Sequence, residues 1–295
     1  MSTGTDPLAP LAELPGVPEA VAEVRRAVDR LYGHRVMRRR AAEVTSEAAL
    51  RGARASAALD GADWPLEEVR RRSDFGADAE ARTVGGALRI SAEAGQLLSV
   101  WRHSPLQVLA RLHLLAVGDA AESAGRPRHG SEDAEALFPL ELKAAEGMAA
   151  AGGAEATALP PAPPADEAAA RLDQLAQLLA SRTEGGATGT PALVVAAVVH
   201  GELLALRPFG SHNGVIARAA QRIVLIAEGL DPKAICPAEV GLAELGTAAY
   251  RVALQGYLSG TADGMAAWIS HCGQALRLGV RESTAVCEAM QRGMV

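Results

Sequence analysis

The sequence is poor in aromatic residues and in cysteine. Phe, Trp and Tyr together make up 3% of the 295 residues, while 49% of the residues are hydrophobic. A core of normal size can therefore form, but it must be packed mainly from Ala, Leu and Val side chains. The three cysteines, Cys236, Cys272 and Cys287, are an odd set without Cys-x-x-Cys spacing. This pattern predicts reduced, buried thiols, and we expect no metal site.

An excess of basic charge and an apolar leader are also missing. The formal net charge is -6 and the isoelectric point is near 5.7, which gives no reason to expect a nucleic acid partner. No apolar segment follows Met1, and residues 1–18, rich in Gly, Pro and Thr, predict a flexible start and no signal peptide. We therefore expect a cytoplasmic protein that does not bind a membrane.

The common catalytic motifs are absent. The sequence has no P-loop, no His-Glu-x-x-His and no Gly-x-Ser-x-Gly. The glycine-rich run at 185–189 follows a helical pattern without a preceding strand, which favours a loop over a phosphate fingerprint. His113 lies on an apolar helix pattern, which indicates a packed residue and no metal ligand.

Two apolar helices are predicted around a short polar loop. Thr190 and Pro191 form a good helix start, with a capping hydroxyl followed by Pro at the first helical position. Residues 192–206 are apolar on nearly every side, which predicts a central, buried helix; polar residues at 200–202 make the apolar run too short for a membrane span. A second helix is expected from about 214 to 228. The pattern predicts an all-α fold built around a buried helix.

The loop between these helices has the features of an anion-binding site. The start of the second helix presents unpaired backbone N–H groups and the positive end of the helix dipole. Gly214 allows a ligand to approach the backbone closely. An anion is therefore expected at this loop.

The same loop resembles the active-site loop of the Fic (Fido) family of nucleotidyl transferases. The family pattern is His-Pro-Phe, one free residue, an acidic residue, Gly-Asn-Gly-Arg, two free residues and Arg. This chain keeps Pro208, Phe209, Asn213, Gly214 and Arg218. It departs from the pattern at Arg207 for the general-base His, Ser211 for the metal-binding carboxylate, His212 for the first Gly and Val215 for the first Arg. The resemblance implies that the anion is a nucleotide, held at Arg207, Ser211, His212, Asn213, Gly214 and Arg218.

The resemblance extends over roughly residues 50 to 275. It implies a Fido-type helical bundle around a central buried helix, and it leaves open a short β-hairpin flap in the segment 118–158, around Leu140 to Lys143. Residues 125–128 are similar to the Gly-x-x-Arg that opens this flap. We expect four parts: a flexible start at 1–18, a helical extension at 19–75, a degenerate Fido domain at 76–280 and a C-terminal helix or tail at 281–295.

A second likeness lies in the helical extension. Ser56, Asp60 and Gly61 resemble the inhibitory helix motif of the family, in which a Ser or Thr is followed after three residues by an acid and then Gly or Asn. The resemblance implies that Asp60 pairs with Arg218 and blocks the seat of a terminal phosphate.

Three functions are compatible with the altered loop. In the first, the protein is a pseudoenzyme that transfers no AMP to proteins, because Arg207 cannot accept a proton and Ser211 offers Mg²⁺ only a neutral oxygen. It would then bind ATP, another nucleotide, a phosphorylated small molecule or a protein. In the second, the site is rebuilt, with His212 as acid or base and Arg207 as a clamp on a phosphate. In the third, the protein is a structural or regulatory partner without a ligand. A homo-oligomer is left open.

Overall fold

The computed structural model describes residues 6–118, 122–138, 159–184 and 189–294. Within these ranges the chain forms helices and no strand, so the all-α prediction is confirmed. The segment around Leu140, where a hairpin was left open, lies outside the described residues. The helices before the middle of the chain are α1 (Ala9–Ala12), α2 (Val17–Tyr32), η1 (Arg35–Arg38), α3 (Ala41–Leu59), α4 (Leu66–Arg71), α5 (Ala79–Glu93), α6 (Leu98–Trp101) and α7 (Pro105–Val117). Those after it are α9 (Ala165–Glu184), α10 (Ala192–Leu206), α11 (Asn213–Ala227), α12 (Ala238–Leu245), α13 (Thr247–Leu258) and α14 (Ala262–Gln291).

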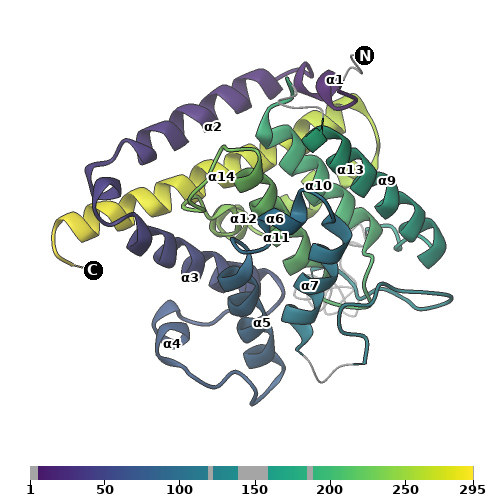
Figure 1. Cartoon of the computed structure of the whole chain (residues 1–295), viewed down its shortest axis with the longest axis horizontal. Helices are drawn as coiled ribbons and strands as arrows, with labels where there is room; N and C mark the ends of the chain where they lie inside the picture. The colour runs from purple at the N-terminus through teal and green to yellow at the C-terminus, as the bar shows by residue number, and fades with distance from the viewer. Residues whose placement is uncertain (1–5, 119–121, 139–158, 185–188, 295) are drawn as a thin grey trace, which may run out of the picture.

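Helix α10 is the centre of the molecule, as its sequence predicts. It packs against α9, α11, α13 and α14, and its apolar residues are buried on all sides (Figure 1). Gly201 lets the aromatic residues of the neighbouring helices approach. A Cβ atom at this position would lie 2.6 Å from the Tyr257 ring and 2.9 Å from Trp268 Nε1. Burial of each large apolar side chain contributes about 1.5–3 kcal/mol, so α10 is held mainly by packing.

The N-terminal part is more ordered than the sequence predicts. Residues 6–18, expected to be flexible, include α1 and the start of α2, and Val17 is fully buried. Helix α2 runs beside α14 in the same direction, since Ala20 and Val24 face Gly273, while Arg40, just beyond η1, reaches the Met290 carbonyl (Figure 1). The predicted boundary at residue 281 falls inside α14, which is continuous.

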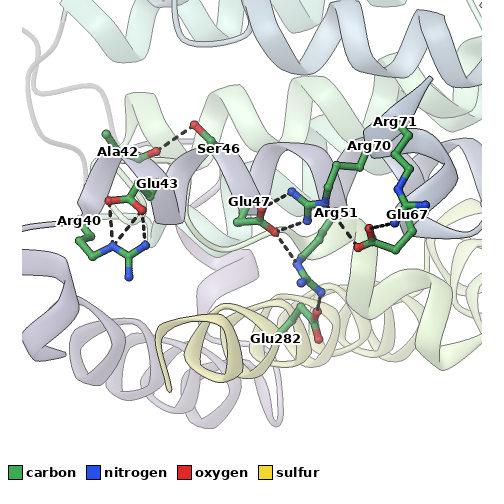
Figure 2. A network of polar contacts seen from close by, with 10 residues as sticks. All are labelled: Arg40, Ala42, Glu43, Ser46, Glu47, Arg51, Glu67, Arg70, Arg71 and Glu282. Atoms are coloured by element: carbon green, nitrogen blue, oxygen red, sulfur yellow. Dashed lines mark hydrogen bonds and ion pairs between the residues drawn. The ribbon is translucent and has the colours of Figure 1, made fainter. Parts of the chain in front are cut away.

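An ion-pair network fixes the position of α3. Glu47 on α3 accepts two hydrogen bonds from Arg70, at 2.6 and 2.9 Å, and also pairs with Arg51 (Figure 2). Arg51 in turn pairs with Glu282 on α14. Hydrogen bonds from Arg70 lower the pKa of the Glu47 carboxyl despite its partial burial. The network ties α3, which carries Ser56 and ends next to Asp60, to α4 and α14.

Within the described part of the chain, no helix combines the length and the apolarity needed to cross a bilayer.

Candidate functional site

The loop between α10 and α11 has a left-handed residue at each end. Arg207, with φ 43° and ψ 64°, ends α10, and His212, with φ 60° and ψ 19°, precedes α11. Such a conformation costs a residue with a side chain roughly 1–3 kcal/mol and persists only where other contacts hold it.

Asn213 supplies one set of these contacts. Its side-chain oxygen accepts a hydrogen bond from the Phe209 N–H at 3.0 Å, and its side-chain nitrogen donates to the Phe209 carbonyl at 2.8 Å. Asn213 is 3% exposed. Both polar ends of the amide are therefore satisfied, and Asn213 braces the loop instead of projecting toward a ligand.

Arg128 supplies a second set. Its guanidinium donates to the carbonyls of Arg207 at 2.8 Å and Leu206 at 3.2 Å, at the C-terminal end of α10. The same group reaches the carbonyls of Glu132 and Pro163. Because the last carbonyls of a helix lack partners within it, this one buried side chain caps α10 and fixes the direction of the loop.

Residues 126–138 lie along the loop and cover it. The Arg128 N–H donates to the Pro208 carbonyl at 2.8 Å, and the Glu135 N–H donates to the Gly210 carbonyl at 2.8 Å. The Glu135 carboxylate accepts a hydrogen bond from the His212 N–H at 3.1 Å. A carboxylate of the chain itself therefore sits at the positive end of α11.

Arg218 lies one turn into α11 and is 2% exposed. Its guanidinium donates to the Ser56 hydroxyl at 2.8 Å, to the Ser56 carbonyl at 3.0 Å and to Asp60 Oδ1 at 2.8 Å. Burial alone would lower the pKa of Arg218, but Asp60 and Tyr250 hold it above its ordinary value. The predicted contact between Asp60 and Arg218 is confirmed. Gly61, with φ 98°, turns the chain directly after it.

Gly214 is required by this pair. A Cβ atom on Gly214 would lie 2.7 Å from Asp60 Oδ1 and 3.0 Å from Arg218 Nη1. The first turn of α11 can pass over the pair only because residue 214 has no side chain.

A buried polar network lies behind Arg218. The Tyr250 hydroxyl hydrogen-bonds Arg218 and lies 2.5 Å from His200 Nε2. Burial, followed by Arg218 and His271, lowers the pKa of His200 well below its ordinary value, so His200 is neutral. Burial likewise raises the pKa of Tyr250. This network adds a second polar contact that orients Arg218, besides those with Ser56 and Asp60.

His212 is the one titratable side chain of the loop that lines its cavity. Its Nδ1 lies 2.8 Å from the Ser211 hydroxyl. The cavity itself measures about 50 Å³ and is bounded by Asp60, Glu135, Phe138, His212 and Gly214 among others. Small-molecule sites usually measure about 300–1,000 Å³, so the loop is closed in this conformation.

Arg207 points away from this cavity. It is 8% exposed, and its guanidinium donates to the Pro160 carbonyl at 2.6 Å. Burial, and then the nearby Arg128, lower its pKa. Val215, where the resemblance would place an Arg, is buried in the core. Among the anion-site residues expected from the sequence, the structure thus brings His212, Asn213, Gly214 and Arg218 together around Asp60, whereas Arg207 faces elsewhere.

The side chains around the loop do not fit a Mg²⁺ ion. Ser211 offers a hydroxyl that is engaged by His212, Asp60 is engaged by Arg218, and Glu135 accepts from the His212 N–H. The described residues contain no group of three His, Cys, Asp or Glu that could hold a metal ion.

Three contributions were missed by sequence reasoning. Glu135 and Phe138 come from an Ala-rich and acidic segment without periodicity, and nothing in that pattern indicates contact with a loop some 75 residues later. Phe138 packs edge-on against Tyr250, with ring centroids 5.1 Å apart. The Gly-x-x-Arg spacing at 125–128 drew attention to Arg128, but the sequence did not indicate that Arg128 would bind the carbonyls at the end of α10.

Comparison with known proteins finds similarity at the level of structure only. No family model and no curated protein matches the sequence. Solved structures do match: a Fic family protein from Desulfovibrio desulfuricans G20 has 22% identity and a TM-score of 0.64, over 90% of this chain and 74% of that one. Fic-1 from C. elegans has 15% identity and a TM-score of 0.64, over 92% and 73%. A Fic domain containing signaling protein from Bacteroides thetaiotaomicron VPI-5482 has 12% identity and a TM-score of 0.61, over 92% and 97%.

Proposed function

Because this chain has the Fic fold, we propose that it is a Fic-fold protein without AMP-transferase activity that binds a nucleotide or another phosphate-bearing ligand at the loop. The ligand site opens when Asp60 leaves Arg218. The observation that carries the proposal is the buried Arg218, held ready by Ser56 and Tyr250 directly below the start of α11.

The start of α11 favours an anion once the carboxylates move. The first N–H groups of a helix have no partner within the helix, and the dipole adds partial positive charge there. Arg218 is a full positive charge beneath the same turn. In the closed structure, the carboxylates of Asp60 and Glu135 provide the negative charge beside Arg218 and the start of α11. A phosphate group could replace them without leaving Arg218 unpaired.

The loop lacks the groups for transfer of AMP to a hydroxyl. The position of the general base is Arg207, whose guanidinium is a donor to the Pro160 carbonyl and has no lone pair to accept a proton. The position of the metal ligand is Ser211, a neutral hydroxyl.

The direct test of this absence is an AMP-transfer assay. The purified protein is incubated with labelled ATP and Mg²⁺, alone and with a mixture of cellular proteins, beside an active Fic protein as positive control. We expect no labelled product from the wild type, nor from Arg207→His, because Ser211 and Val215 remain unsuitable. Label on the wild type that disappears in His212→Ala would overturn the proposal.

A rebuilt active site is the second candidate, and one contact favours it. His212 Nδ1 is hydrogen-bonded to Ser211, which could orient the ring for acid–base work. The contact of Arg207 with Pro160 weighs against its proposed role as a phosphate clamp. Turnover of any nucleotide by the wild type, lost in both Ser211→Ala and His212→Ala, would favour this candidate.

A structural or regulatory role without a ligand is the third candidate. The small volume of the closed cavity is the observation in its favour. Thermal stabilisation by ATP, AMP or phosphate separates it from the other two, because a ligand that binds only the native state raises the melting temperature.

A further inference from the structure

A larger cleft lies at the other end of α10. Residues of α2, α6, α9, α10 and α11 enclose a volume of about 620 Å³ around Pro191 to Leu193. Since α10 has 15 residues, this cleft is separated from the loop by about 22 Å of helix. Its volume falls within the range of about 300–1,000 Å³ that is usual for small-molecule sites. It is thus distinct from the site proposed above.

The wall of the cleft is apolar. Val24 of α2, Leu193 of α10 and Val224 of α11 line it and are 1%, 2% and 1% exposed. Trp101 adds an aromatic face from α6, and Leu179 closes the side formed by α9. These side chains have fixed positions in the core, so the wall is preformed for an apolar group.

The charged side chains of the cleft are mostly cations. Arg25, Arg102 and Arg182 line it, against one carboxylate, Glu228. Arg25 lies at the exposed rim, 4.0 Å from Asp29 outside the cleft. For Arg102 no ion pair is found among the described residues. A positive rim around an apolar wall attracts ligands of negative charge.

Arg182 shows that carboxylates of the chain itself already occupy the inner part of the cleft. It is 6% exposed, pairs with Asp6 and lies 3.4 Å from Glu228 Oε2. Its Nε atom is buried and has no acceptor among the described residues. Asp6 also accepts the Thr190 hydroxyl at 2.5 Å, beside the start of α10, where Pro191 has no capping side chain. The chain itself thus places carboxylates around this arginine, and the planar guanidinium matches the geometry of a carboxylate.

We propose that this cleft binds a small amphipathic carboxylate. The apolar body lies against Trp101, Leu193 and Val224. The acid group lies beside Arg102 and Arg25 at the rim, because Arg182 is already paired with Asp6 and Glu228. No covalent step is involved, and the ligand need not reach the loop.

The probe for this proposal is 1-naphthoate, with 1-naphthamide as its neutral match. Isothermal titration calorimetry on the full chain should detect binding of 1-naphthoate and weaker binding of 1-naphthamide. Arg102→Gln should weaken naphthoate binding by roughly three- to tenfold, the usual effect of a charge-assisted contact that is partly exposed, and should leave amide binding unchanged. Arg39→Gln, an exposed arginine outside the cleft, is the matched control and should have no effect.

A second variant tests the apolar wall. Ala227→Phe fills the cleft from α11, where Ala227 is only partly buried, and should abolish binding of both probes while the circular dichroism spectrum stays helical. The proposal is overturned if neither probe binds the wild type at millimolar concentration. Equal binding of acid and amide, or unchanged binding by Ala227→Phe, would overturn it as well.

Discussion

At the scale of single residues, the pair of Asp60 and Arg218 is the contact on which the site depends. Removing one partner of a buried pair leaves the other charge unpaired and costs about 3–5 kcal/mol, against about 0–1 kcal/mol for an exposed pair. Arg218 is buried and the Asp60 side chain is 23% exposed. We expect Asp60→Asn to lower the free energy of unfolding by about 1–3 kcal/mol, measured by urea denaturation. Asp63→Asn, in the exposed pair with Arg54, is the control and should change it by less than about 1 kcal/mol. Equal effects of the two variants would contradict the buried pair.

Gly214 gives a second prediction for the same contact. Gly214→Ala places a Cβ atom 2.7 Å from Asp60 Oδ1, so the pair of Asp60 and Arg218 must shift. We expect the free energy of unfolding to fall by about 1–3 kcal/mol. In an Asp60→Ala background the loss should shrink, because the clashing atom is gone. Gly210→Ala, where an added Cβ meets nothing within 4 Å, is the control. Additive losses in the double variant would show that Gly214 does not act through Asp60.

His113, which packs next to the loop, makes the free energy of unfolding depend on pH. Burial, and then the nearby His212, lower the pKa of His113 to about 4. An unfolded His has a pKa of about 6.5, so between these values the unfolded state binds more protons. The stabilisation that comes from burying His113 in its neutral form is therefore complete above about pH 6.5, and it is lost as the pH falls toward about 4. His113→Gln, which can still accept the Gly125 N–H, should show a smaller fall in the free energy of unfolding between pH 7 and pH 4.5. Parallel profiles for the two proteins would contradict this.

At the scale of elements, Arg128 joins the covering segment to the end of α10. Arg128→Met removes its contacts with the carbonyls of Leu206, Arg207 and Pro163. We expect the free energy of unfolding to fall by about 2–4 kcal/mol and residues 126–138 to be cleaved faster by a protease. Arg126→Met removes an exposed pair with Glu132 and is the control. It should leave the free energy of unfolding and the rate of proteolysis nearly unchanged. Equal cleavage rates would show that the segment is held by other contacts.

Elements with local signals could be predicted from the sequence, whereas their long-range partners could not. The apolar run of α10 predicted its exact bounds, and α11 begins within one residue of the expected position. Thr190 was expected to cap α10, but its hydroxyl donates to Asp6, far away in the sequence. For the same reason, nothing in the sequence indicated that Arg207 would turn to Pro160 or that Glu135 would reach His212.

At the scale of the whole molecule, this chain combines the Fic fold with a loop whose sequence differs from the Fic pattern that it resembles. The fold depends on buried apolar positions such as those of α10, which tolerate substitution as long as volume and pattern remain. The loop depends on single side chains, and these differ at Arg207, Ser211, His212 and Val215. The contact between Asp60 and Arg218 satisfies a buried charge whatever the loop binds. Under the proposed function, the site has the contact that closes it without the groups for AMP transfer.

The most direct test of this account is calorimetry with ATP and with inorganic phosphate on the wild type, Asp60→Ala and the double variant Asp60→Ala/Arg218→Ala. Removing Asp60 frees Arg218 and the start of α11, so Asp60→Ala should bind at least about tenfold more tightly than the wild type, a difference of about 1.4 kcal/mol. The double variant should lose that gain, and Asp63→Ala, outside the site, should match the wild type. If Asp60→Ala binds neither ATP nor phosphate, the loop is not an anion site and the proposed function is wrong.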